Sequence, residues 1–221
     1  MPNTAAYKSF ATSRYVDLHF LLLLNQKLPE QAFIDYVTQN YDPPPVSTED
    51  ARAEADHFRQ QVYHIQWSRA IDSFQVYVTA VLREILLQKP EIMKSSEKLT
   101  FEEVLNTGNF DGVVALMVEK VITPLAGFKA LEAWFEKRKI PLVVSEAERK
   151  ILGEAIGTRN IIVHNSGIVN QRYLDEFMWK SFKLGDFRRI GFGELLELEK
   201  LLSRVVLATD SEIAAKFKIA T

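Results

Sequence analysis

The sequence predicts an all-α fold, an antiparallel helical bundle with an N-terminal helical extension. Apolar residues recur at helical spacing along most of the 221 residues. Three segments open with Ser or Thr followed three residues later by an acidic residue, as helix starts often do. No pair of segments shows the alternation typical of paired strands. Successive prolines at residues 43–45 separate an extension at 1–45 from a bundle at 46–221.

The N-terminal half of the chain is expected to be built from long helices. Residues 5–25 are apolar on most sides, and residues 29–40 form a second, shorter helical segment. Ser47 and Asp50 resemble a capping box, and apolar residues then recur at helical spacing until Pro90. This pattern predicts one long helix, or two joined end to end, that Pro90 terminates.

Capping and breaking signals divide the next part of the chain. Thr100 with Glu103 marks a second helix start, and Gly108-Asn109 is a break before an apolar helix at residues 111–122. Pro124 fits the first turn of the following helix. The apolar stripe expected on that helix consists of Leu125, Phe128, Leu131 and Phe135.

The helix that begins at Ser145 has the clearest boundaries. Its partner Glu148 completes a third capping pattern, and Gly167 is the expected stop after His164 or Asn165. Residues 168–192 are rich in aromatic and basic residues and have no clear assignment. Residues 193–217 predict one or two final helices.

Composition excludes several kinds of site. The chain has no cysteine, so disulfides, thiolate metal sites and cysteine nucleophiles are ruled out. The net charge is −2, whereas nucleic-acid-binding domains are usually strongly basic. The longest apolar stretch, Leu18–Leu24, is far shorter than the roughly 20 residues of a membrane span. Phosphate-loop, dinucleotide and zinc-protease motifs are missing. We therefore expect a cytoplasmic protein with no membrane contact, metal or cofactor.

Three polar residues gather near the end of the helix expected from Ser145. With about 100° per residue and Arg159 at zero, Asn160 lies at about 100° and His164 at about 140°, so all three share one side. Arg159 rises from an expected apolar face made of Ile151, Leu152, Ala155, Ile156, Ile162 and Val163. A guanidinium in that place needs a carboxylate or phosphate partner, because burying it unpaired is costly.

Two glycines belong to the same side of this helix. Gly153, Gly157, Asn160 and His164 form a straight stripe along one edge. A glycine inside a helix costs roughly 1 kcal/mol relative to alanine, so we expect another backbone to approach closely there. That backbone belongs either to a second helix of the chain or to the same helix of a second protomer, which would bring two copies of His164 together.

The motif Arg159-Asn160-x-x-x-His164, followed by Asn165-x-Gly167-x-Val169 and Tyr173-Leu174, resembles the signature of the HEPN domain family. Members of that family are helical bundles that carry an arginine, a polar residue directly after it and a histidine about one turn further on. The resemblance is specific for this helix and its exit. It extends more loosely over residues 48–217 and does not include the N-terminal extension.

The resemblance implies a metal-independent endoribonuclease that acts as a homodimer, with the two motif helices facing each other across a cleft. His164 would act as general base on the ribose 2′-hydroxyl or as general acid towards the departing oxygen. Arg159 would bind the scissile phosphate, and Asn160 would orient the phosphate or the histidine. Attack by the 2′-hydroxyl leaves a cyclic phosphate and needs no cation.

Alternatives stay open for the function and for the residues. Family members also serve as noncatalytic modules that bind RNA or a protein partner. Many belong to toxin–antitoxin or phage defence systems, which implies an antitoxin or a defence-system protein as partner. Without the resemblance, a salt-bridged surface arginine and a satisfied core histidine are the commoner explanation of Arg159 and His164.

Residues 179–192 interleave aromatic and basic side chains, a pattern typical of surfaces that bind single-stranded nucleic acid. The candidates for RNA contact are Trp179, Lys180, Lys183, Arg188 and Arg189. The alternative is a loop whose aromatic rings fill the bundle and whose cations face water.

Overall fold

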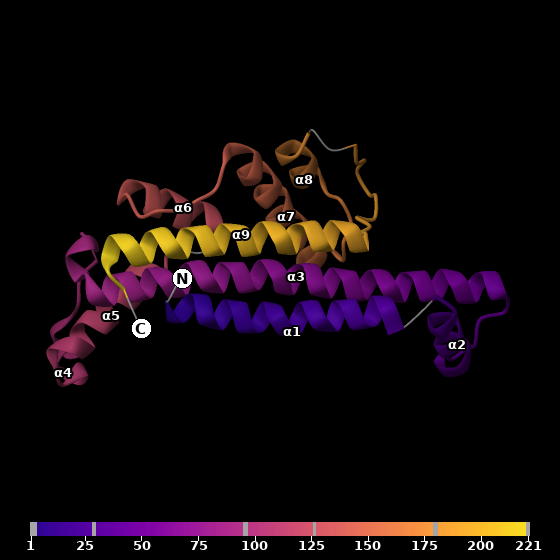
Figure 1. The fold of residues 1–221 in the computed structure, drawn as a ribbon, viewed down its shortest axis with the longest axis horizontal. Coiled ribbons are helices and arrows are strands. Elements are labelled where there is room, and N and C mark those ends of the chain that lie inside the picture. The colour runs from indigo at the N-terminus through magenta and orange to yellow at the C-terminus, as the bar shows by residue number, and fades with distance from the viewer. Residues whose placement is uncertain (1–3, 28–29, 95–96, 126, 179–180, 220–221) are drawn as a thin grey trace. The chain divides into compact units, whose positions relative to one another are not determined.

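A computed structural model describes residues 4–27, 30–94, 97–125, 127–178 and 181–219. These residues form nine α-helices, one short 3-10 helix and an isolated bridge between Ile168 and Phe187, with no strand ladder among them. The chain is an all-α helical bundle (Figure 1), which confirms the predicted fold class.

The helices follow the expected order. They are α1 (Ala5–Lys27), α2 (Glu30–Asn40), α3 (Thr48–Gln88), η1 (Pro90–Ile92), α4 (Phe101–Thr107), α5 (Phe110–Ile122), α6 (Phe128–Lys137), α7 (Glu146–Asn165), α8 (Gln171–Glu176) and α9 (Phe192–Phe217). The segment that starts at Ser47 is one helix of 41 residues. The amide of Asp50 donates to Oγ of Ser47 at 3.1 Å, as a helix start requires.

The start of α6 differs from the prediction. Pro124 does not lie in the first turn of α6, because α6 begins only at Phe128. Gly127, directly before it, has φ of 90°, which no helical residue adopts. In the segment without a clear assignment, α8 forms a short helix whose first turn is capped by Asn170, where Oδ1 accepts from the amide of Tyr173 at 2.9 Å.

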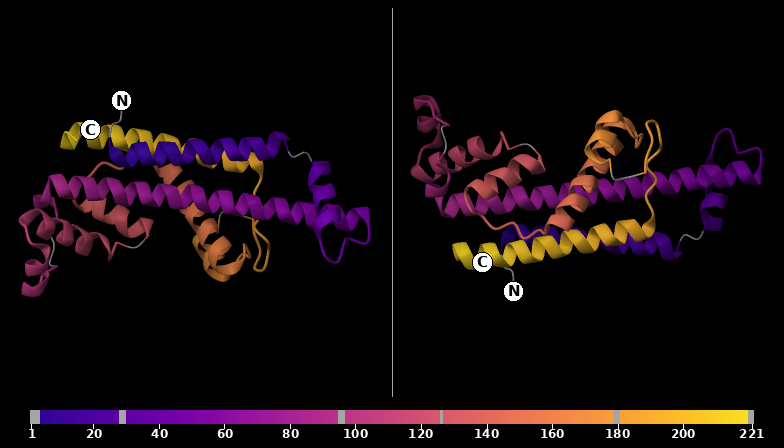
Figure 2. Two further views of the ribbon diagram at one scale, coloured as in Figure 1. Left: turned by 90° about the horizontal axis from the view of Figure 1, so that it is seen from below. Right: turned by 90° about the horizontal axis from the view of Figure 1, so that it is seen from above.

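The chain divides into two compact units. Unit 1 consists of Met1–Thr12, Ser73–Val144 and Ser203–Thr221, and unit 2 of Ser13–Asp72 and Ser145–Leu202. Helices α1, α3 and α9 therefore contribute to both, and within each unit their segments lie side by side (Figure 2). The expected boundary after residue 45 falls in the connection between α2 and α3, and the division into extension and bundle stays a prediction.

Unit 1 has a core of large apolar side chains from α3, α5, α6 and α9: Phe74, Leu82, Val118, Phe135 and Val206. The buried carboxylate of Asp210 accepts a hydrogen bond from the Tyr77 hydroxyl and one from the Thr4 amide, each at 3.4 Å. Burial, with the nearby Asp210 charge, raises the pKa of Tyr77 above its ordinary value. These bonds hold the start of α1 to α9 within unit 1.

Unit 2 buries Leu21, Trp67, Ile71, Leu152 and Leu195. The indole Nε1 of Trp67 donates to the carbonyl of Ala155 at 2.9 Å, which fixes α3 against α7. A buried ion-pair group joins α1 to α9: Arg14 lies 2.9 Å through Nε from Glu199 and 2.9 Å through Nη1 from Asp17. Buried charges of this kind are stable only when paired.

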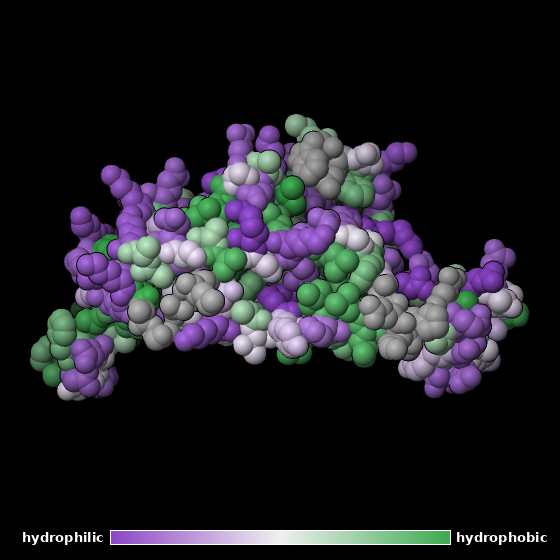
Figure 3. Space-filling view, viewed as in Figure 1, coloured by the Kyte–Doolittle hydropathy of each residue, from purple (hydrophilic) through white to green (hydrophobic). Residues whose placement is uncertain are grey.

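Among the exposed large apolar side chains, two groups lie close together in the sequence. One group lies on α1, where the space-filling view shows apolar surface over the C-terminal half of the helix (Figure 3): Tyr15, Val16, Phe20 and Leu23. The other lies on α4 and the start of α5: Phe101, Leu105 and Phe110.

None of the helices in the described ranges combines the length and apolar character that crossing a membrane requires.

Candidate functional site

Helix α7 carries the three candidate catalytic residues. It begins with a complete capping box, in which Oγ of Ser145 accepts from the Glu148 amide at 3.3 Å and the Glu148 carboxylate accepts from the Ser145 amide at 2.9 Å. It ends at Asn165, and the next residues, Ser166 and Gly167, have left-handed φ values of 51° and 77°. Both ends agree with the sequence prediction.

The buried face of α7 differs from the expected apolar face. Leu152 and Ala155 are buried as predicted, but Ile151 and Val163 are 49% and 50% exposed. Glu154 and Thr158 are buried in their place, at 3% and 0% exposure. Hydropathy assigned only apolar residues to this face. Polar residues can take it here because other parts of unit 2 supply their hydrogen-bond partners.

Arg159 is half-buried and paired. Its Nε donates to Oδ1 of Asp72 on α3 at 2.9 Å, and its side chain keeps 24% of its surface exposed. Its Nη1 lies 3.4 Å from Oδ1 of Asn160. Asp72 is thus the carboxylate partner that the position of Arg159 required. No local signal could have identified Asp72, which lies 87 positions away in the chain.

Asn160 and His164 lie together on the exposed side of α7. They are four residues apart, so their side chains are neighbours one turn apart. His164 is exposed and therefore is not a core histidine. Arg159, by contrast, forms an ion pair with Asp72, as expected if the arginine serves only the fold. The site thus brings an exposed imidazole, an exposed amide and an arginine neutralised by Asp72 to one helix.

Gly153 and Gly157 face an aromatic ring instead of another backbone. A Cβ added to Gly157 would lie 2.2 Å from Cε2 of Phe177, and one added to Gly153 would lie 4.0 Å from Cε1 of the same ring. Phe177 follows α8 and is 6% exposed. The close approach expected at the glycines is therefore supplied within the chain, and the glycines themselves no longer argue for a second protomer.

A buried polar cluster on α7 was missed by the sequence analysis. Oε1 of Glu154 accepts hydrogen bonds from the hydroxyl of Tyr173, from Oγ1 of Thr158 at 2.9 Å and from Nη2 of Arg188 at 3.3 Å. The Thr158 and Tyr173 hydroxyl oxygens are 3.0 Å apart. Burial, with the adjacent Glu154 charge, raises the pKa of Tyr173 to about 12. The cluster joins α7, α8 and the chain before α9.

Arg188 belongs to this cluster and not to an RNA surface. Its side chain is 3% exposed, and its guanidinium is paired with Glu154 and with Glu194. Contact with a phosphate would require both pairs to break in a buried place, which is costly. We therefore correct its assignment from RNA contact to stabilisation of unit 2.

The other candidates for RNA contact separate into three groups. Lys183 is exposed. Arg189 is exposed at 59% of its side chain, and its guanidinium is paired with Asp56 of α3. Trp179 and Lys180 lie outside the described residues.

The described aromatic side chains of this segment pack inwards. The Phe182 ring lies 6.1 Å from the Tyr173 ring, and the Phe187 ring lies 5.0 Å from the imidazole of the buried His64. Both phenylalanines are half-buried. Of the alternating aromatic and basic side chains, these two rings therefore pack against Tyr173 and His64, whereas Lys183 and Arg189 lie at the surface.

Comparison with known proteins adds no relative. No protein-family model, no curated protein and no solved structure matches the chain.

Proposed function

We propose that the chain is a metal-independent endoribonuclease of the HEPN class, which cleaves RNA by 2′-hydroxyl attack at a site shared by a homodimer in the cytoplasm. One observation carries the proposal: Asn160 and His164 are exposed together on α7, with the Arg159 guanidinium beside Asn160. The motif resemblance supplies the class of reaction, and the exposure of these side chains leaves them accessible to a substrate.

Each residue has a role that its chemistry allows. The His164 imidazole removes the proton from the 2′-hydroxyl, whose oxygen then forms a bond to phosphorus while the bond to the 5′-oxygen breaks. A second imidazole, from the partner protomer, gives a proton to that oxygen. The products are a 2′,3′-cyclic phosphate and a 5′-hydroxyl, so the bonds and protons balance.

Arg159 can bind the phosphate without releasing Asp72. A guanidinium has five N–H donors, and Asp72 engages Nε at 2.9 Å. One N–H of Nη1 donates to Oδ1 of Asn160 at 3.4 Å, so the other N–H of Nη1 and the two of Nη2 are the donors that would bind phosphate oxygens. In this arrangement Asp72 orients the arginine and lowers the net charge of the site.

The central test is cleavage of single-stranded RNA by the purified protein in EDTA. Wild type should produce 2′,3′-cyclic phosphate ends, detectable by mass spectrometry, and His164→Ala should abolish cleavage. His19→Ala is the matched control, because His19 is also an exposed helical histidine but lies on α1. Cleavage that survives His164→Ala, or that requires added magnesium, would contradict the proposal.

The shared site requires a dimer. Sedimentation velocity should show a dimer at the protein concentrations at which RNA is cleaved. A strictly monomeric protein with full activity would remove the second histidine from the mechanism.

The toxin or phage-defence role is part of the same proposal and rests on the resemblance alone. Expression in bacteria should then arrest growth, and His164→Ala should restore it. Growth arrest that His164→Ala does not relieve would argue against an RNA-cleaving toxin.

A noncatalytic module that binds RNA or a protein partner is the second candidate. The Arg159–Asp72 ion pair favours it, because a paired arginine can serve the fold alone. RNA binding measured by fluorescence anisotropy separates the two candidates. Binding without cleavage, unchanged in His164→Ala, would support the noncatalytic module.

A further inference from the structure

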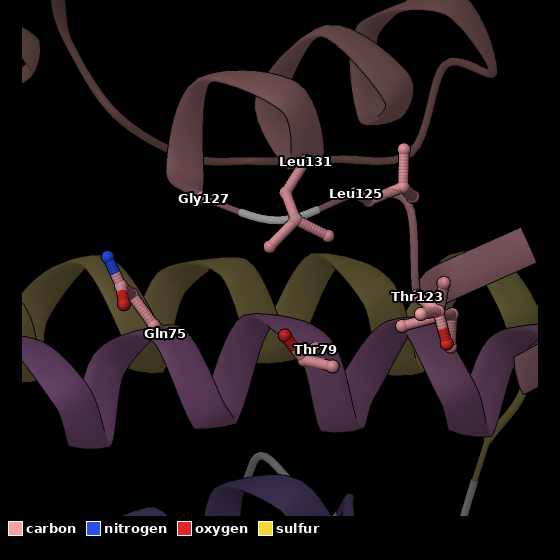
Figure 4. A pocket seen from close by; sticks show the side chains of 7 residues that line it. Gln75, Thr79, Thr123, Leu125, Gly127 and Leu131 are labelled. Atoms are coloured by element: carbon pink, nitrogen blue, oxygen red, sulfur yellow. The ribbon is translucent and has the colours of Figure 1, made fainter.

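A pocket in unit 1 is lined by none of the residues assigned to RNA cleavage. It has a volume of about 250 Å³ and lies between α3 and the connection from α5 to α6 (Figure 4). Its walls include Gln75 and Thr79 of α3, Ile122 and Thr123 near the end of α5, Leu125 of the connection and Leu131 of α6. The pocket is therefore built from three helices and one connecting segment of the same unit.

The polar side chains that line the pocket are uncharged and have hydrogen-bonding groups available for a ligand. Gln75 and Thr79 are four residues apart on α3, so they lie next to each other on one face of the helix. Both are half-buried, and neither side chain is hydrogen-bonded to another of the described residues. Oγ1 of Thr123 donates to the Glu119 carbonyl at 2.7 Å, so its oxygen can still accept.

The remaining walls are apolar. Ile122 and Leu131 are 6% and 3% exposed, and the Leu131 side chain points towards α3 between Gln75 and Thr79 (Figure 4). The lining contains no ionisable side chain, so a charged ligand would lose its hydration without gaining a counter-charge. The pocket therefore favours an uncharged ligand with an apolar body and hydrogen-bonding groups on its edges.

We infer that this pocket binds a small uncharged heterocycle of the nucleobase type. The Gln75 amide offers a donor and an acceptor side by side, which matches the paired donor and acceptor on the edge of a base. Thr79 and Thr123 add hydroxyl oxygens to the lining, and Ile122 and Leu131 add apolar surface against which a ring can pack. The volume is below the roughly 300–1,000 Å³ of pockets for drug-sized ligands. A single ring system without sugar or phosphate fits best.

The experiment uses the full-length protein with free adenine and free uracil as probes. Saturation-transfer NMR should show saturable binding of at least one base. In the NMR spectrum of the protein itself, the backbone amide signals that shift on binding should be those of Gln75, Thr123, Gly127 and their neighbours. Gln75→Leu and Thr79→Val remove hydrogen-bonding groups at half-exposed helical positions and should each weaken binding by about three- to tenfold. Gln88→Leu is the matched control, because Gln88 is an exposed glutamine at the end of α3, outside the pocket.

Two further probes separate this proposal from unspecific apolar binding. Toluene has the apolar body without hydrogen-bonding groups, and benzoate adds a charge, so both should bind at least tenfold more weakly than the base. Absence of saturable binding by either base would overturn the inference. Toluene binding as tight as the base, or full binding in both Gln75→Leu and Thr79→Val, would also overturn it. The proposal does not depend on RNA cleavage, so each can fail separately.

Discussion

Replacing Gly157 by alanine tests how α7 packs against the Phe177 ring. In an ordinary helix interior this change stabilises by about 1 kcal/mol, because alanine loses less backbone entropy than glycine. At Gly157, however, the new Cβ would lie 2.2 Å from Cε2 and 2.7 Å from Cζ of Phe177. Carbon atoms pack best at about 3.5 Å or more, so the ring would have to retreat by roughly 1 Å.

The ring has little room to retreat. Phe177 is buried in a cluster with Ile161, Val169 and Tyr173, and the Tyr173 ring centroid is 5.0 Å away. Overpacking of a closely packed core costs about 1–3 kcal/mol. After the gain in helix propensity, we expect Gly157→Ala to lower the free energy of unfolding by about 1 kcal/mol, and by up to about 2 kcal/mol if the ring cannot move.

Gly153→Ala is the matched control, because Gly153 lies on the same helix and faces the same ring. Its Cβ would meet Phe177 Cε1 at 4.0 Å, an ordinary contact. This variant should therefore stabilise the protein by about 0.5–1 kcal/mol. The difference between the two variants isolates the overpacking cost, since both gain the same helix propensity.

Urea unfolding followed by circular dichroism at 222 nm measures both free energies. Phe177→Leu combined with Gly157→Ala should lose less stability than the two single changes predict together, because the smaller side chain leaves room for Cβ. If Gly157→Ala proves as stabilising as Gly153→Ala, the packing of Phe177 against α7 described above is wrong.

Three further changes test unit 2. Arg188→Met should lower the free energy of unfolding by about 3 kcal/mol or more, because it removes the buried cation that pairs with Glu154 and Glu194. The neighbouring exposed Arg189→Met should change the free energy of unfolding by less than about 0.5 kcal/mol, and equal effects of the two variants would contradict the buried role of Arg188. The pKa of Tyr173 is raised from 10.0 to about 12 in the folded protein. The protonated Tyr173 hydroxyl therefore stabilises the folded state fully below pH 10, and this stabilisation is lost as the pH rises towards 12. Titration of unfolding against pH should show this loss in wild type and a smaller one in Tyr173→Phe. Ser145→Ala should lower the free energy of unfolding by about 1 kcal/mol, because it removes the N-cap of α7. Ser203→Ala is the control, since Ser203 is exposed and caps no helix, and thermal unfolding measures both variants.

Short-range signals in the sequence predicted the helices and most of their ends. Ser145 with Glu148 caps α7 through hydrogen bonds within one turn, and Pro90 stops α3 because proline lacks an amide donor. The prediction for α6 was wrong because it took Pro124 as the start of the helix, whereas Gly127, with its positive φ, directly precedes the first helical residue, Phe128. The same local geometry placed Arg159, Asn160 and His164 on one side of α7.

The partners of these residues were decided only by the tertiary structure. Asp72, which pairs with Arg159, lies 87 positions away in the chain. Phe177, which fills the edge along Gly153 and Gly157, follows the next helix along the chain. Capping bonds and φ restrictions act within a few residues and leave a local pattern. A pairing between helices depends on how the helices cross and on which faces meet. The hydropathy pattern therefore does not mark a buried acid such as Glu154, whose burial becomes visible only when Tyr173 and Arg188 pack against it in the folded chain.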